Sequence, residues 1–147
     1  ANDAFHQTAS SVEGEGAYRC MKNALNIAGL EPAEISYINV HGTGTLNNDQ
    51  SEGMALKRIF SGNVPPFSSI KPFFGHTLGA SEGIEAVFSV LSVSNGYIYP
   101  NLNFRETDQN IGLTPVVEWK EKRLIRNVLS NSFGFGGNDS SLLFSAI

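Results

Sequence analysis

The sequence predicts an α/β fold in which helices pack against a mixed β-sheet. Strand and helix patterns alternate between residues 14 and 96, and two apolar runs flank a glycine-rich loop near the end of the chain. Alternating strands and helices favour parallel pairing, whereas two runs joined by one loop favour an antiparallel hairpin. We expect the 147 residues, 1–147, to form one domain.

The first helix is expected from Gly14 to Ala28, after a polar and irregular segment, residues 1–13. Apolar residues recur there at spacings of three and four, the pattern of an amphipathic helix, and Gly29 ends it. They are Ala17, Cys20, Met21, Ala24, Leu25 and Ala28. Because Cys20 lies inside this stripe, we interpret it as a small buried hydrophobic residue and not as a nucleophile.

A first strand–loop–helix unit follows. Residues 35–40 form its expected strand, and Asn48 or Asp49 can cap its helix, which ends before Gly62. The buried side of this helix is expected to carry Met54, Ala55, Ile59 and Phe60. The pattern therefore predicts a Gly/Thr-rich loop between a short strand and an amphipathic helix.

A second unit of the same kind comes next. The strand is expected at residues 67–71, where Pro72 prevents its continuation, and the helix from Ala80 to Ser94, closed by Asn95-Gly96. This helix carries Ile84, Val87, Phe88 and Leu91 at helical spacing.

The last third of the chain contains fewer elements. We expect an extended piece at 97–103 and a loop at 104–122 that touches the core through Val116, Val117 and Trp119. The apolar runs 128–133 and 141–146 then predict a hairpin with a wide glycine loop at 134–139.

Composition excludes several classes of function. A formal charge of −4, with no basic group longer than residues 120–126, argues against a nucleic-acid face. The single cysteine excludes an internal disulfide and is compatible with a reducing compartment, so we expect a cytoplasmic protein. Neither a leader peptide nor an apolar run long enough for a membrane span is visible, although the sequence begins with Ala1.

Two histidines mark the candidate site. Lys71 and His76 stand five residues apart on a turn broken by Pro72 and Gly75, and we expect them to converge at the lip of the sheet. His41 follows the earlier strand and opens the Gly/Thr loop. Two strands that each lead to a histidine indicate a functional site.

Three segments, His41-Gly-Thr-Gly-Thr45, Lys71-Pro-Phe-Phe-Gly-His76 and Asn131-Ser-Phe-Gly-Phe-Gly-Gly137, occur in this order. In order and spacing they closely resemble the C-terminal half of the β-ketoacyl-[acyl-carrier-protein] synthases. The resemblance spans essentially the whole chain. It implies the C-terminal half of a thiolase-like fold, in which each half contributes a mixed five-stranded sheet and helices. It also implies that the nucleophilic cysteine lies in an N-terminal half that is absent here, so that the fragment alone is inactive.

The resemblance implies that His41 and His76 donate N–H groups to the enolate oxygen that forms when a malonyl thioester loses CO2. Lys71 is the third implied catalytic residue, and it is implied to pair with Glu85. Asp49 and Glu52 are implied supporting residues, although they could equally cap a helix and complement its dipole.

Thr43 and Thr45 are implied to bind the phosphopantetheine arm of an acyl carrier protein. The amide of Phe135 is implied to form one arm of an oxyanion hole, with Gly134 and Gly136 giving the backbone clearance. The rings of Phe135 and Phe133 resemble a gate of the acyl pocket.

The implied partners are acyl carrier protein, the N-terminal half of the same enzyme and, at full length, a second copy in a homodimer. No resident cofactor and no metal are expected, since phosphopantetheine arrives on the carrier protein. We expect the face that meets the other half to be apolar, so that the isolated fragment self-associates or is marginally stable.

Other interpretations remain open. The chain could belong to a non-catalytic partner resembling a chain-length factor, although the retained histidines and lysine argue against this. A metal hydrolase using His6, His41, His76 and Asp49 is a third reading, disfavoured because there is no helical His-x-x-x-His pair. His6 taken alone is more simply a structural residue.

Two departures from the family pattern stand out. Asn138-Asp139 places an acid after the glycine loop, and Phe73 and Phe74 follow Lys71 where smaller residues are usual. The chain-length preference of the pocket stays open for this reason.

Overall fold

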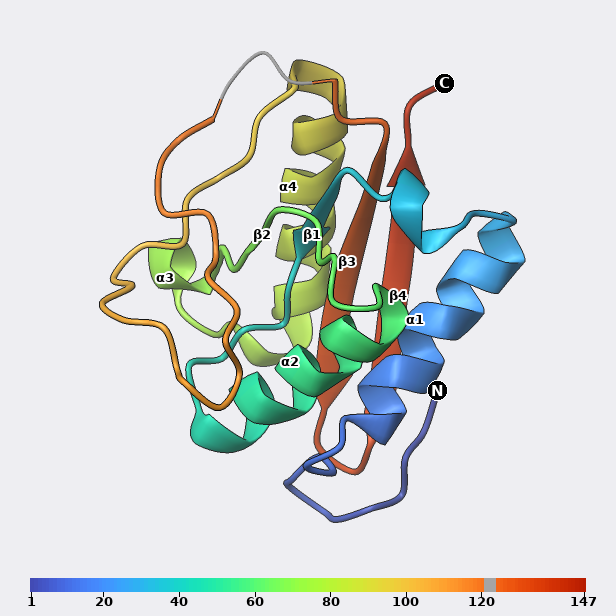
Figure 1. Cartoon of the computed structure of the whole chain (residues 1–147), viewed down its shortest axis with the longest axis vertical. Coiled ribbons are helices and arrows are strands. Elements are labelled where there is room, and N and C mark those ends of the chain that lie inside the picture. Colours follow the sequence, from blue (N-terminus) through green and yellow to red (C-terminus); the bar gives the residue numbers. More distant parts are fainter. Residues whose placement is uncertain (121–123) are drawn as a thin grey trace.

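Four strands form one mixed sheet in the computed structural model, which describes residues 1–120 and 124–147 (Figure 1). Their order is β2 (Phe67–Ser68), β1 (Tyr37–Asn39), β3 (Asn127–Gly134) and β4 (Asn138–Ser145). Strand β1 pairs in parallel with both β2 and β3, and β4 is antiparallel to β3. The expected α/β class with a mixed sheet is confirmed.

Helices cover both faces of this sheet. Figure 1 shows α1 (Glu15–Ala28) and α2 (Leu46–Ile59) on one face and α4 (Ser81–Asn95) on the other. The short helix α3 (Lys71–Phe74) follows β2, and two 3-10 turns, η1 (Pro32–Glu34) and η2 (Leu78–Ala80), complete the elements described. Because both faces are covered, every residue of β1 is buried.

The side chains of β1 alternate between two cores. Ile38 belongs to the larger core, which packs against α1 and α2, whereas Tyr37 belongs to a smaller core that Val93 of α4 contacts. This is the period of two that a strand imposes. The larger core also contains Met21, Leu25, Ala55, Leu56, Phe60 and Leu129.

Helix α4 faces the sheet with small polar residues. Its buried positions are Ser81, Glu85, Ser89 and Ser92, while Val87 is 57% exposed and Val90 and Leu91 are also exposed. Val87, Val90 and Leu91 therefore point away from the sheet, whereas Ile84 and Phe88 are half-buried and the Phe88 ring contacts Tyr99. Of the helices that the structure describes, none combines the length and the apolar character that a membrane span requires.

Several expected boundaries were wrong. Helix α2 begins at Leu46, two residues before Asn48, because its N-cap is Thr45, which adopts an extended conformation and whose hydroxyl accepts a hydrogen bond from the Asn48 N–H (3.4 Å). Strand β2 is only two residues long. Lys71 starts helix α3 instead of ending a strand, with Pro72 in the first turn, where proline is tolerated.

The C-terminal hairpin also differs from the expectation. The strands extend to Gly134 and Asn138, so the turn contains only Phe135, Gly136 and Gly137 and is tight, not wide. The region described contains four strands, not the five that the resemblance implies for each half. Ala1 and Asn2 lie beside the start of β4, where the Asp139 N–H donates to the carbonyl of Ala1 (2.9 Å).

Other expectations lie on the remaining loops. The expected loop 104–122 and the basic group 120–126 include residues 121–123, which lie outside the described residues. Val116 packs against the smaller core and the Trp119 ring contacts Tyr97 and Tyr99, whereas Val117 is exposed.

Candidate active site

Three segments meet at one edge of the sheet. Strands β1, β2 and β3 run in the same direction, so their carboxyl ends lie at the same edge. His41 follows β1 by two residues, Lys71 follows β2 by three, and Gly134 ends β3. Residues that are far apart in the sequence therefore come together in one site.

His41 and His76 are in direct contact. Their ring centroids lie 5.5 Å apart and the rings meet edge to face, with an interplanar angle of 84°. His41 is 6% exposed, whereas His76 lies at the surface. The two histidines of the sequence motifs thus form a pair with one buried and one accessible member.

The hydrogen bonds of both rings indicate the same tautomer. Nζ of Lys71 lies 3.3 Å from Nδ1 of His41, and because an ammonium group can only donate, this nitrogen accepts. The Leu78 N–H donates to Nδ1 of His76 (3.2 Å). In the neutral form, each ring therefore carries its proton on Nε2.

His41 is held in its neutral form. Burial, the positive charge of Lys71 and the neighbouring His76 together lower the pKa of its imidazole to about 3, and burial is the largest of these causes. Burial disfavours a charged ring, because the charge loses its hydration. At neutral pH, His41 can therefore donate a hydrogen bond without carrying a charge.

Lys71 forms a buried ion pair with Glu85 of α4. Its ammonium group contacts Oε1 of Glu85 and also the backbone carbonyl of His41, and both side chains are almost entirely buried. Glu85 accepts two further hydrogen bonds, from the hydroxyls of Ser132 (3.0 Å) and Ser81 (3.4 Å). The cation is thus compensated, as a buried charge requires. The pairing implied by the resemblance is present.

Glu52 holds the loop that carries His41. Its buried carboxylate accepts the N–H groups of His41 and Gly42, each at 3.0 Å, and the side-chain amide of Asn131 at 3.1 Å. Burial raises the pKa of Glu52, and these donors oppose that rise. Glu52 lies on α2, but its hydrogen bonds go to the loop and to β3 and not to the helix terminus.

Gly42 allows the loop to pass close to the chain after β2. Its φ is +47°, and a Cβ at this position would lie 2.7 Å from the Cβ of Ser69. Both the backbone conformation and the close approach favour glycine.

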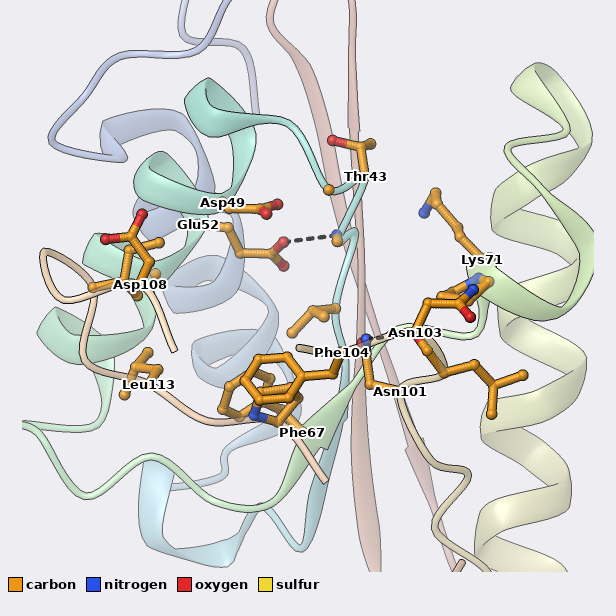
Figure 2. A pocket seen from close by; sticks show the side chains of 18 of the residues that line it. Thr43, Asp49, Glu52, Phe67, Lys71, Asn101, Asn103, Phe104, Asp108 and Leu113 are labelled. Carbon is orange, nitrogen blue, oxygen red and sulfur yellow. Dashed lines mark hydrogen bonds between the residues drawn. The ribbon is translucent and has the colours of Figure 1, made fainter. Parts of the chain in front are cut away.

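A cavity of about 630 Å³ opens next to His76, which lines it. Figure 2 shows other residues that line this cavity, among them Thr43, Lys71 and Glu52. Thr43, Lys71 and His76 line its polar end, and Asp49 and Glu52 come from α2. Burial raises the pKa of Asp49. The rest of the wall combines apolar side chains, among them Leu56, Phe67, Phe104, Ile111, Leu113 and Pro115, with the polar residues Asn101, Asn103, Arg105, Glu106 and Asp108. Gly42 and Thr43 are among the described residues that line the cavity, and His41 is not.

Other predicted site residues lie further from the pair. Thr45 caps α2, and its hydroxyl is 3.0 Å from that of Thr43. The Phe133 ring lies 5.6 Å from the His41 ring, centroid to centroid. Phe135 is 80% exposed in the turn, between the exposed residues Gly134 and Gly136.

The remaining candidates do not join the site. His6 is exposed, and its Nδ1 accepts the Thr8 N–H (3.1 Å). Cys20 is buried in α1, and burial raises the pKa of its thiol. Within residues 1–120 and 124–147, no three side chains of histidine, cysteine, aspartate or glutamate gather in a way that could hold a metal ion.

Sequence reasoning missed Asn131 and Ser132. Both stand in the Asn131-Ser-Phe-Gly134 segment that it had singled out, but only the aromatic and glycine residues received a role. Adjacent residues of a strand point to opposite faces, so Asn131 reaches Glu52 on α2 while Ser132 reaches Glu85 on α4. That alternation was the signal that could have identified them.

Comparisons with known proteins identify the family of this chain. A family model described as beta-ketoacyl synthase, C-terminal domain, matches residues 1–105. The chain is 43% identical over 145 residues to 3-oxoacyl-[acyl-carrier-protein] synthase 2 of Rhizobium meliloti, covering 97% of this chain and 34% of that protein. It spans about a third of the length of this relative.

Solved structures show the same fold. One is the ketosynthase ApeO in complex with its chain length factor ApeC, from Xenorhabdus doucetiae (39% identity, TM-score 0.87, covering all of this chain and 37% of that one). Another is the AntDE:AntF complex, a type II polyketide acyl carrier protein with its ketosynthase bound to the hexaketide (31% identity, TM-score 0.94, 100% and 36% coverage). The predicted resemblance and the thiolase-like fold are confirmed.

Proposed function

Because the chain belongs to the β-ketoacyl synthase family and matches its C-terminal domain, we propose that residues 1–147 form this domain in a longer decarboxylating condensing enzyme. The enzyme would join an acyl thioester to a malonyl group on an acyl carrier protein, in fatty-acid or polyketide synthesis. One observation carries the proposal. Two histidines touch, and each has its Nδ1 occupied by a donor, which leaves the Nε2–H to donate.

These two N–H groups suit the decarboxylation step. When the malonyl carboxylate leaves as CO2, the electrons of the broken carbon–carbon bond move onto the thioester oxygen and form an enolate. Neutral hydrogen-bond donors that are already in position when the reaction starts stabilise this charge. The loss of one such donor typically lowers the rate about a hundredfold to a thousandfold. Lys71 keeps His41 in the required tautomer and adds positive potential.

Condensation then consumes the enolate. Its carbon attacks the carbonyl of an acyl group held as a thioester on a cysteine of the N-terminal half, a carbon–carbon bond forms, and the thiolate leaves. We assign one arm of the oxyanion hole in this step to the amide of Phe135. We assign the gate to the rings of Phe135 and Phe133, of which Phe133 already lies near His41.

The carrier protein is the proposed partner, and its phosphopantetheine arm is the only cofactor that the reaction needs. Thr43 supports this assignment, because it lines the cavity beside Lys71 and His76. Thr45 would act through its contact with Thr43. A ketosynthase with a carrier protein bound is among the structural neighbours, at 31% identity.

The 147-residue chain alone is proposed to be inactive. Its single cysteine, Cys20, is buried and its thiol pKa is raised, so it lacks the thiolate character of a nucleophile. The N-terminal half would cover the exposed apolar stripe of α4, and the full-length enzyme would form a homodimer.

The test uses the intact enzyme and the isolated chain side by side. With malonyl carrier protein and an acyl donor, the intact enzyme is expected to release CO2 and form a 3-oxoacyl product, and His41→Ala or His76→Ala is expected to reduce CO2 release about a hundredfold or more. Mass spectrometry of the isolated chain is expected to show no acyl group on Cys20. A stable thioester on Cys20, or full activity of both histidine variants, would contradict the proposal.

A chain-length-factor-like subunit is the rival class. Such a subunit has no need of two neutral imidazoles and a paired lysine, which this chain retains. The residue at the nucleophile position of the longer protein separates the two, since only the condensing enzyme requires a cysteine there.

A further inference from the structure

Asn131 is a buried polar residue that has no role in the proposed mechanism. It lies in the middle of β3 and is completely buried. Its side chain contacts three elements: Glu52 of α2, Met21 of α1 and Ser141 of β4. A buried amide held by three elements has one orientation. That orientation decides whether the Glu52 carboxylate accepts a hydrogen bond from the amide N–H or faces the amide oxygen.

The orientation of the amide follows from its neighbours. The Ser141 hydroxyl donates to Oδ1 of Asn131 (2.8 Å), and Nδ2 of Asn131 donates to Oε1 of Glu52 (3.1 Å). The reversed amide would place Oδ1 against the carboxylate, where two acceptors would repel each other. Ser141 therefore fixes the amide so that its N–H faces Glu52.

The Glu52 carboxylate in turn holds the backbone of His41. The same oxygen that accepts from Asn131 also accepts the His41 N–H, and the other oxygen accepts the Gly42 N–H. On the far side, the carbonyl of His41 contacts the ammonium group of Lys71. The backbone of His41 is thus held between a buried anion and a buried cation.

We infer that Asn131 is a positioning residue for the proposed reaction: its amide holds the Glu52 carboxylate against the N–H groups of His41 and Gly42, and so sets the place of the His41 imidazole. This inference rests on the proposed function for its catalytic consequence, although the contacts themselves do not depend on it. Removal of the amide leaves a buried carboxylate with one donor fewer, which costs more than the loss of an exposed hydrogen bond.

Asn131→Asp tests the inference, because it replaces the donor with an acid of the same shape. At low pH the new carboxyl group is protonated and can donate to Glu52 as the amide does. As the pH rises it loses this proton, and two carboxylates then face each other near a single cation, Lys71. The effect of the substitution is therefore expected to grow with pH.

The first readout is the imidazole spectrum of the 147-residue chain, measured by proton–nitrogen NMR from pH 5 to 8. The unsubstituted chain is expected to show His41 as the neutral Nε2–H tautomer throughout. Asn131→Asp is expected to resemble it near pH 5 and to shift or broaden the His41 signals at higher pH. Asn23→Asp, the same chemical change on the exposed side of α1, is expected to leave them unchanged.

The second readout is decarboxylation by the intact enzyme. Asn131→Asp is expected to lower kcat by about 10- to 100-fold at pH 8 and to change KM much less, because a displaced His41 imidazole stabilises the transition state less but leaves substrate binding intact. Near pH 5 the effect on kcat is expected to be much smaller. If this variant does not fold, Ser141→Ala replaces it. That change frees the Asn131 amide to rotate and is expected to disturb the same signals to a smaller extent.

The outcomes are separable. An unchanged His41 spectrum together with an unchanged kcat across this pH range, in whichever of the two variants folds, would overturn the positioning role. If the intact enzyme releases no CO2 even without substitution, the proposed function fails. The imidazole spectrum then still decides whether Asn131 positions His41.

Discussion

Nζ of Lys71 lies 3.3 Å from Nδ1 of His41 and also contacts the carboxylate of Glu85. One buried cation therefore binds both an acid on α4 and an imidazole that follows β1. This arrangement joins the ionisation of His41 to the packing of α4 against the sheet. A change at any of the three residues is therefore expected to alter both stability and the site.

The titration of His41 gives the first prediction. Its folded pKa of about 3 is below the ordinary value of about 6.5, so the unfolded chain takes up a proton first as the pH falls. The stability from neutral His41 is thus fully present above about pH 6.5 and is lost as the pH falls toward about 3, by roughly 1 kcal/mol per pH unit. Urea unfolding from pH 7 to 4 should show a weaker pH dependence in His41→Gln, whereas His6→Gln, at an exposed position, should match the unsubstituted chain.

Breaking the ion pair gives the second prediction. Lys71→Met leaves the Glu85 carboxylate buried without its cation, and we expect the free energy of unfolding to fall by about 3 to 5 kcal/mol. The double variant Lys71→Met, Glu85→Leu removes both charges and is expected to recover most of that loss in denaturant unfolding. Equal stability of the single variant and the parent chain would show that the pair does not hold α4 in place.

The loop after β1 gives the third prediction. Gly42→Ala combines a positive φ with a Cβ only 2.7 Å from Ser69, so we expect a loss of about 2 to 4 kcal/mol. Gly44→Ala is the matched control. Its φ is +72° but a Cβ there meets no atom within 4 Å, so only the conformational cost of about 1 to 2 kcal/mol applies. Thermal unfolding of the two variants should rank them in this order, and the reverse order would exclude the close approach as the cause.

The exposed stripe of α4 gives the fourth prediction. Val87, Val90 and Leu91 form an apolar surface that the described residues leave exposed, so the isolated chain is expected to self-associate as its concentration rises. Val87→Glu with Leu91→Glu should shift sedimentation velocity profiles toward the monomer. Ile27→Glu changes an apolar residue that is 88% exposed on α1 and serves as the control. An equal effect of both substitutions would show that association does not depend on α4.

Much of the architecture could be predicted from local patterns. The helices at 15–28 and 81–95 and the hairpin were all expected, because their signals lie within a few residues of the chain. Boundaries were less accurate. The start of α2 depends on whether the Thr45 hydroxyl reaches the Asn48 N–H, and the end of β2 depends on where pairing with β1 stops.

The orientation of α4 shows a different limit. Its apolar spacing predicts a helix with one apolar face, but the sheet receives the serine and Glu85 face instead. Apolar residues at helical spacing indicate that one face of a helix will be covered. They do not indicate whether the sheet of the same domain or another surface covers it.

The sequence by itself determined the family and the α/β class, and it pointed to His41, Lys71 and His76 as candidate site residues because they stand in short motifs at strand ends. Only the tertiary structure decided how these groups act together. The hydrogen bond of Asn131 with Glu52 spans 79 residues and the contact of Lys71 with Glu85 crosses from α3 to α4. Such contacts, and the tautomers and pKa that follow from them, depend on how separate elements pack, which no local pattern contains.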